Sequence, residues 1–144
     1  MARVTIYTDG AARGNPGPSA SGYMIYDSKE ELLAGHSEYN GVKTNNFAEY
    51  SAVLHALEWC AENLDAKSME IDLYSDSELV VKQLNGHYKI KAPHIKELNE
   101  KVKGVKGRFR SVIFRNLPRE NPYIKAVDRS LNKLLDGIEK DNKE

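Results

Sequence analysis

Apolar and polar side chains alternate over the first third of the chain, which is the pattern of strands that bury one face. The alternation covers residues 4–9, 20–26 and 31–39, and a turn over residues 27–30 separates the last two runs. Over residues 47–64 the apolar side chains instead recur every three to four positions, which is helical spacing. We therefore expect three consecutive antiparallel strands followed by a long helix.

The second half of the chain alternates between strand and helix patterns. Residues 69–76 and 108–114 have the alternation of strands, whereas residues 78–84, 92–103 and 123–139 have helical spacing. Three antiparallel strands followed by strand–helix crossovers make a mixed sheet with helices packed on its faces. The pattern therefore predicts an α/β fold built on a five-stranded mixed sheet and flanked by helices.

Length and composition then limit the class of protein. The chain has 144 residues, of which 40% are hydrophobic and 29% charged, and no linker or repeat divides it. We expect a single domain over residues 1–140 and a frayed tail over residues 141–144. The single cysteine, Cys60, cannot form a disulfide within the chain, and no apolar run approaches the roughly 20 residues of a membrane span. These features favour a cytoplasmic protein without a membrane partner.

The net charge is zero, but the two signs are separated along the chain. Residues 1–81 hold 5 basic and 13 acidic side chains, whereas residues 82–119 hold 11 basic and 2 acidic side chains. A run of like charges often means no more than a solvated surface. A bias sustained over the whole of the second segment favours a polyanionic partner, such as a nucleic acid.

Acidic side chains stand at the ends of two predicted strands. Asp9 closes the first strand and Asp76 the fourth, while Glu49 lies near the start of the long helix and Asp128 lies in the final helix. Asp9 also fits the start of a simple turn, and Glu49 fits the favourable field at a helix N-terminus. If the two strands are parallel neighbours, however, the carboxylates meet and repel one another unless a cation lies between them. Oxygen ligands alone select Mg²⁺ or Mn²⁺, and a pair of such ions suits hydrolysis of a nucleic-acid backbone.

Several motifs resemble those of type 1 ribonuclease H, in the order of that family and over nearly the whole chain. They are YTDGA at residues 7–11 with GNPGP at 14–18, TNNFAEY at 44–50 and SDSELVVKQL at 75–84. A weaker match, AVDRSLN at 126–132, is similar to the last motif of the family. The resemblance implies a ribonuclease H-like fold and a metal-dependent endonuclease. Such an enzyme cuts the RNA strand of RNA/DNA hybrids by two-metal-ion hydrolysis and leaves a 3′-hydroxyl and a 5′-phosphate.

The resemblance also implies roles for particular residues. The positions that match the ligands of two Mg²⁺ or Mn²⁺ ions are Asp9, Glu49, Asp76 and Asp128. The positions that match contacts to the RNA strand are Gly10, Asn15, Asn45 and Asn46. Thr44 matches a contact to a phosphate of the DNA strand, and Glu78 replaces a glutamine that contacts the substrate in many members. We expect an RNA/DNA hybrid as the partner of a monomer that needs no other protein.

The last motif and the loop before it depart from the family. No histidine follows His94, although members often carry one in this loop, so Arg119 and Glu120 are the candidates for its role. Ile124 replaces an asparagine ahead of the last aspartate, and the short segment over residues 85–103 lacks the basic handle of some members. Two alternatives therefore stay open. One is a non-catalytic nucleic-acid-binding module on the same fold, and the other is a nuclease of this fold that acts on double-stranded RNA.

Overall fold

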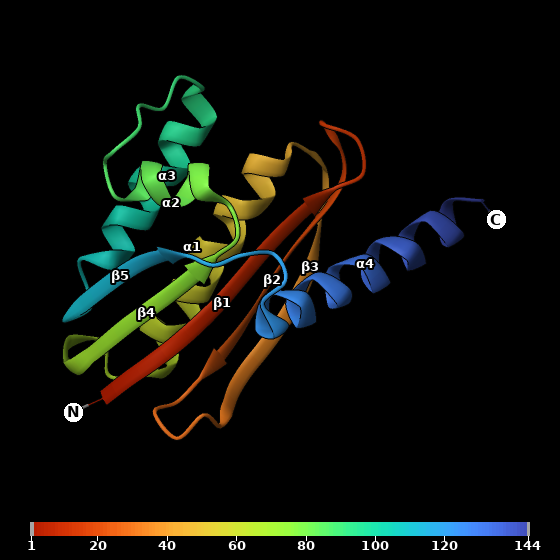
Figure 1. Cartoon of the computed structure of the whole chain (residues 1–144). Helices are drawn as coiled ribbons and strands as arrows, with labels where there is room; N and C mark the ends of the chain where they lie inside the picture. The colour runs from red at the N-terminus through yellow and green to blue at the C-terminus, as the bar shows by residue number, and fades with distance from the viewer. Residues whose placement is uncertain (1, 144) are drawn as a thin grey trace.

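The computed structural model describes residues 2–143 and arranges five strands in one sheet with helices on both faces (Figure 1). The strand order is β3-β2-β1-β4-β5. β2 pairs antiparallel with both β1 and β3, whereas β4 pairs parallel with both β1 and β5. The strands are Ala2–Ala12 (β1), Gly17–Tyr26 (β2), Leu32–Lys43 (β3), Met69–Ser75 (β4) and Ser111–Asn116 (β5). The predicted five-stranded mixed sheet is confirmed.

The helices begin where the sequence supplies capping residues. Thr44 caps the first helix and Ser77 the second, each by accepting a hydrogen bond from the backbone N–H three residues further on. Pro93 opens the third helix, in a position where its missing N–H costs no hydrogen bond. The helices are Asn45–Asn63 (α1), Glu78–Leu84 (α2), Pro93–Lys106 (α3) and Pro122–Lys143 (α4), with a short 3₁₀ turn over Ala66–Ser68 (η1).

The last strand begins later than the sequence pattern predicts. The pattern placed it over residues 108–114, whereas β5 begins at Ser111. The backbone N–H groups of Gly107, Arg108 and Phe109 still donate to carbonyls of α3, so the chain stays tightly wound here. The Phe109 side chain is nevertheless buried, which is why the alternation appears to begin too early.

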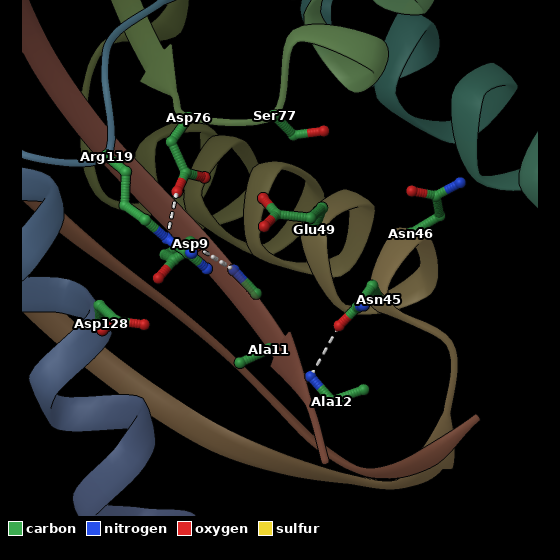
Figure 2. Close-up of a pocket in the computed structure, with 11 residues that line it drawn as sticks. Asp9, Ala11, Ala12, Asn45, Asn46, Glu49, Asp76, Ser77, Arg119 and Asp128 are labelled. Atoms are coloured by element: carbon green, nitrogen blue, oxygen red, sulfur yellow. Dashed lines mark hydrogen bonds and ion pairs between the residues drawn. The ribbon is translucent and has the colours of Figure 1, made fainter. Parts of the chain in front are cut away.

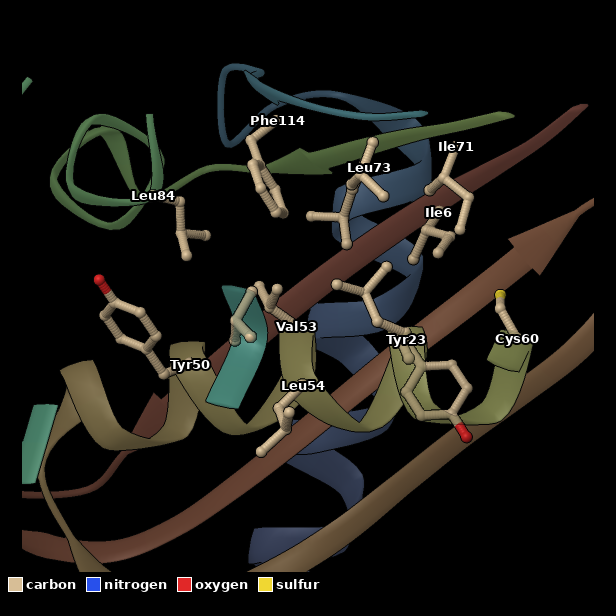
Figure 3. Packing of buried hydrophobic residues seen from close by; sticks show 14 of the residues in the cluster. Ile6, Tyr23, Tyr50, Val53, Leu54, Cys60, Ile71, Leu73, Leu84 and Phe114 are labelled. Atoms are coloured by element: carbon tan, nitrogen blue, oxygen red, sulfur yellow. The ribbon is translucent and has the colours of Figure 1, made fainter. Parts of the chain in front are cut away.

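Most of the core lies between the sheet and α1 (Figure 3). Ile6, Ile71 and Leu73 project from β1 and β4 and pack with Val53 and Tyr50 of α1, and all five are fully buried. Each such side chain contributes roughly 1.5–3 kcal/mol relative to an exposed one. The core therefore fixes α1 against the central strands, which matters because both carry candidate site residues.

α4 lies across β1, β2 and β3 on the other face of the sheet (Figure 1). The predicted apolar stripe is confirmed, because Ile124, Val127, Leu131 and Leu135 are buried. Gly22 of β2 lets the helix approach, since a side chain there would strike two residues of this stripe. α4 is thus held at a fixed distance from the strands that end at the candidate site.

The helix continues through Lys143, so residues 141–143 have helical backbone, and Glu144 lies outside the described residues. The single domain over residues 1–140 and the frayed tail stay predictions. None of the described helices combines the length and the apolar character that crossing a membrane requires.

Candidate active site

The register of β1 and β4 brings two aspartates to one edge of the sheet. Thr8 pairs with Ser75 in the parallel ladder, so Asp9 and Asp76 follow at the same level. The idea that Asp9 merely starts a turn is wrong, because β1 continues to Ala12 through its antiparallel pairing with β2. Asp9 is thus held within a paired strand rather than at a free end.

Glu49 joins the two aspartates because β1 passes directly against the start of α1. The contact falls at Gly10, where a Cβ would overlap the backbone of Ala48 and Glu49, so a glycine is required. The hydroxyl of Ser21 on β2 also donates to the Ala48 carbonyl at 2.6 Å and fixes the same helical turn. The backbone therefore sets the position of Glu49 beside Asp9.

The three carboxylates form one compact cluster (Figure 2). Asp9, Glu49 and Asp76 each offer an oxygen, and these oxygens lie within 4.8 Å of one another. Asp9 is 4% exposed and Glu49 is 8% exposed, so water does little to separate their charges. The Gly10 N–H donates to Asp9 Oδ1 at 3.0 Å, and the Ser75 hydroxyl donates to Glu49 Oε2 at 3.4 Å. Such a set of oxygens is suited to a divalent cation.

Burial raises the pKa values of all three carboxyls, and the charges of neighbouring carboxylates add to the rise. Burial is the largest cause for Asp9, followed by the charges of Glu49 and Asp76. Burial also dominates the raised pKa of Glu49, with the Asp76 charge as the next cause. Burial raises the pKa of Asp76 as well, but the Arg119 guanidinium, with Nε 3.9 Å from Oδ2, opposes the rise. The cluster therefore retains protons without a cation, and a bound cation would displace them.

A pocket of about 520 Å³ opens over the cluster. Asp128 enters it from α4, on the wall facing α1, and points toward the other carboxylates (Figure 2). Among the described residues, Asp128 lies outside the group whose oxygens approach within 4.8 Å. The full lining is Asp9, Gly10, Ala11, Ala12, Asn45, Asn46, Glu49, Asp76, Ser77, Arg119 and Asp128.

The residues expected to contact the RNA strand divide into two groups. Gly10, Asn45 and Asn46 line the pocket, whereas Asn15 does not. Asn15 instead accepts a hydrogen bond from the Asn45 N–H at 3.0 Å, and Asn45 Oδ1 accepts one from the Ala12 N–H at 2.9 Å. These bonds connect the loop after β1 to the start of α1 and leave the Asn45 amide nitrogen available to the pocket.

The other expected site residues also differ in position. Thr44 and Glu78 are not among the lining residues, and the Glu78 carboxylate pairs with Lys82 at 2.6 Å on the surface of α2. Of the two loop candidates, Arg119 lines the pocket and Glu120 does not. The geometry therefore favours Arg119 over Glu120 as the residue that takes the role of the missing loop histidine.

Sequence reasoning did not assign the pocket-lining residues Ala11, Ala12 and Ser77 to the site, and it also missed two residues that donate hydrogen bonds to the carboxylates. Ser75 is buried and donates to Glu49, and its place on the inward face of β4 follows from the alternation of that strand. Asn132 Nδ2 donates to Asp128 Oδ2 at 3.1 Å. Its spacing of one helical turn from Asp128 was the available signal.

The basic segment seen in the sequence is divided in space. Arg110 and Arg115 pair with acidic side chains of β4 on the sheet face that points away from α1. Lys89 and Lys91 line a separate hollow of about 260 Å³, which they share with Asn46. Because Asn46 also lines the acidic pocket, the basic hollow adjoins it.

Known proteins share both the sequence and the fold. The family model described as RNase H matches residues 1–126. Ribonuclease HI of Halobacterium salinarum is 34% identical over 134 residues, which cover 93% of this chain and 65% of that protein. Bifunctional protein Rv2228c of Mycobacterium tuberculosis is 32% identical over 137 residues, which cover 94% of this chain and 36% of that protein. The chain thus spans about a third of the mycobacterial relative and slightly less than two thirds of the halobacterial one.

A solved structure extends the likeness. The crystal structure of LC11-RNase H1 in complex with RNA/DNA hybrid has a TM-score of 0.81 and 40% sequence identity, and covers 92% of this chain and 99% of that chain. The mixed sheet and its acidic pocket define an α/β protein with a candidate metal site. The chain belongs to the RNase H family.

Proposed function

We propose that the chain is a metal-dependent endonuclease that hydrolyses the RNA strand of RNA/DNA hybrids. The observation that carries the proposal is the meeting of Asp9, Glu49 and Asp76 within 4.8 Å in an open pocket. Membership of the RNase H family supports the reaction class. The hybrid in the related LC11-RNase H1 complex supports the substrate class.

The residues of the cluster fit Mg²⁺ or Mn²⁺. Carboxylate oxygens are the ligands that both ions prefer, and the described lining of the pocket includes no histidine or cysteine. Among the described residues, Arg119 pairs with Asp76 and with neither Asp9 nor Glu49. Most of the negative charge of the cluster is therefore not neutralised by a basic side chain. Asp9, Glu49 and Asp76 would hold two ions, with Asp128 as a further ligand. When bound, such ions activate water and stabilise the leaving oxygen.

The pocket's own polar groups would hold the RNA strand over the carboxylates. Asn45 and Asn46 line the pocket, and an amide both donates and accepts hydrogen bonds. A 2′-hydroxyl does the same, which is how a site distinguishes RNA from DNA. Scission of the bond between phosphorus and the 3′-oxygen would leave a 3′-hydroxyl and a 5′-phosphate.

The basic hollow would receive the second strand. Lys89 and Lys91 lie beside Asn46, so phosphates can follow from the acidic pocket into cationic surroundings. Phosphate contacts make affinity fall steeply with salt. We also propose that the protein acts on the hybrid as a monomer, without an obligate protein partner.

A substrate panel tests the proposal. RNA/DNA hybrid, double-stranded RNA and double-stranded DNA of one sequence are incubated with the protein and Mn²⁺, and the product ends are identified. We expect cleavage of the RNA strand of the hybrid alone, with 3′-hydroxyl ends. Cleavage of double-stranded RNA would instead support the rival nuclease. Binding of hybrid without cleavage of any substrate would identify a binding module.

A further inference from the structure

Asp128 is held from within its own helix. Asn132 lies one turn further along α4, and its Nδ2 donates to Asp128 Oδ2 at 3.1 Å and to the Asp128 carbonyl at 3.0 Å. Both side chains are half-buried. One carboxylate oxygen is therefore engaged by Asn132, while the Asp128 side chain lines the pocket and points toward the other carboxylates (Figure 2).

Arg13 determines which way the Asn132 amide points. Arg13 Nη2 lies 3.3 Å from Asn132 Oδ1 and 3.2 Å from the Asn132 carbonyl. A guanidinium carries donors and no acceptor, so it selects the oxygen of the amide. The NH₂ group of Asn132 must then face Asp128, which requires a donor.

Arg13 is itself anchored at several points. Its Nη2 lies 2.7 Å from Asp136 Oδ1, and its Nη1 lies 2.9 Å from Glu139 Oε2. Arg13 follows β1 directly after the pocket-lining residue Ala12. The side chain thus ties the sheet side of the pocket to the last turns of α4.

We propose that Arg13 and Asn132 form a positioning relay that orients the Asp128 carboxylate as a metal ligand. The relay rests on the proposed function, since it concerns the same metal site. Neither Arg13 nor Asn132 is among the residues that line the pocket, so both would act through Asp128. Partners that orient a metal ligand typically change metal affinity or activity by about 10- to 100-fold when they are removed.

The relay predicts a specific kinetic signature. Asn132→Ala should lower kcat by about 10-fold and raise the Mn²⁺ concentration for half-maximal activity by about 10-fold. KM for the hybrid should change less than about twofold, because the amide is not expected to contact nucleic acid. Arg13→Ala should shift metal dependence in the same direction and also lower Tm, because it anchors the end of α4.

A double-mutant cycle tests whether Asn132 acts through Asp128. Asn132→Ala is made in the wild type and in Asp128→Asn, with Ser130→Ala as a matched control. The Ser130 hydroxyl donates to the Val127 carbonyl on the same helix and does not contact Asp128. We expect a clear loss from Asn132→Ala in the wild type, little further loss in Asp128→Asn, and no loss from the control.

Calorimetric titration with Mn²⁺ supplies a readout that is independent of turnover. Weaker Mn²⁺ binding by Asn132→Ala, with an unchanged far-ultraviolet spectrum, would support the relay even if no hybrid were cut. Unaltered Mn²⁺ affinity, or equal losses from Asn132→Ala in both backgrounds, would overturn it. Failure of the wild type to cleave hybrid would contradict the proposed function instead.

Discussion

The two sides of the acidic pocket hold their carboxylates by different means. On the sheet side, the β1–β4 register and the close approach at Gly10 place Asp9, Asp76 and Glu49 through the backbone. On the α4 side, Asp128 depends on the side chain of Asn132. Backbone placement tolerates repulsion between buried charges, whereas side-chain placement can adjust when a ligand arrives. The sheet side should therefore dominate activity, and the α4 side should modulate it.

Gly10→Ala should disrupt the sheet side of the pocket and lower both stability and activity strongly. The new methyl group would overlap the backbone of Ala48 and Glu49, so β1 and α1 must separate. We predict a loss of about 3 kcal/mol, or about 6–12 °C in Tm, and less than about 1% of wild-type cleavage. Gly104→Ala in α3, where a Cβ meets open space, is the control and should retain both Tm and activity. A fully active Gly10→Ala protein would show that the approach is not required.

Asp128→Asn should have a smaller effect on activity. The substitution keeps the size of the side chain but removes one charge from the helix side of the pocket. We expect kcat to fall about 10- to 100-fold, with Tm unchanged or slightly raised. Steady-state kinetics at saturating Mg²⁺ and Mn²⁺ measure the loss. Complete inactivation would mean that both sides of the pocket are equally essential.

Arg119→Ala should lower kcat less than Asp128→Asn does. Arg119 lines the pocket and lies 3.9 Å from Asp76, but its side chain is largely exposed. We predict a decrease in kcat of about 10-fold or less, measured under single- and multiple-turnover conditions. Glu120→Ala serves as the neighbouring control, because Glu120 does not line the pocket and should be neutral. If the two losses were equal, the loop would act through its backbone rather than through Arg119.

Removing a carboxylate from the sheet side should also change the stability of the metal-free protein, and this is the smallest effect that we predict. Without metal, the raised pKa values of Asp9 and Glu49 exceed their ordinary values of 3.8 and 4.5, so the folded state binds protons more tightly than the unfolded state. This contribution is complete below about pH 4 and is lost as the pH rises through the folded pKa values. Asp9→Asn should therefore stabilise the metal-free protein increasingly with pH.

Thermal melts in chelator between about pH 5 and pH 8 measure this difference. We expect a gain of about 3–6 °C for Asp9→Asn at pH 8, corresponding to about 1.5 kcal/mol, and a smaller gain at pH 5. Saturating Mg²⁺ should stabilise the wild type and reduce the gap in Tm between Asp9→Asn and the wild type. A gap that narrows as the pH rises in chelator would contradict the assigned direction of the pKa shifts.

Sequence patterns were sufficient to predict most of the sheet side of the pocket. Alternation predicted β1 and β4, and their chain order placed Asp9 and Asp76 at one edge once the strands were parallel neighbours. The end of β1 was harder to predict, because residues beyond Asp9 look like a turn and yet remain paired with β2. Local propensity does not reveal such pairing, since the partner strand is distant in sequence.

The helix side was less predictable for a different reason. The apolar stripe indicated α4, but it did not show that Arg13 reaches Asn132 across 119 positions of sequence. The separation of charge along the chain was similarly incomplete as a guide, because Arg110 and Arg115 pair with β4 rather than line the pocket. Contacts between distant side chains depend on how elements pack, which no single element encodes.

The most direct test of the metal-dependent site compares Asp76→Asn with the wild type on an end-labelled RNA/DNA hybrid. Asp72→Asn, four residues earlier on the outer face of β4, is the matched control. Each protein is assayed with Mg²⁺, with Mn²⁺ and with chelator, and hybrid binding is measured alongside. We predict metal-dependent cleavage of the RNA strand by the wild type and the control, and a loss of at least about 1,000-fold in Asp76→Asn with binding retained. Cleavage that persists in chelator, or near-wild-type turnover by Asp76→Asn, would contradict the assignment of the acidic cluster as the catalytic metal site.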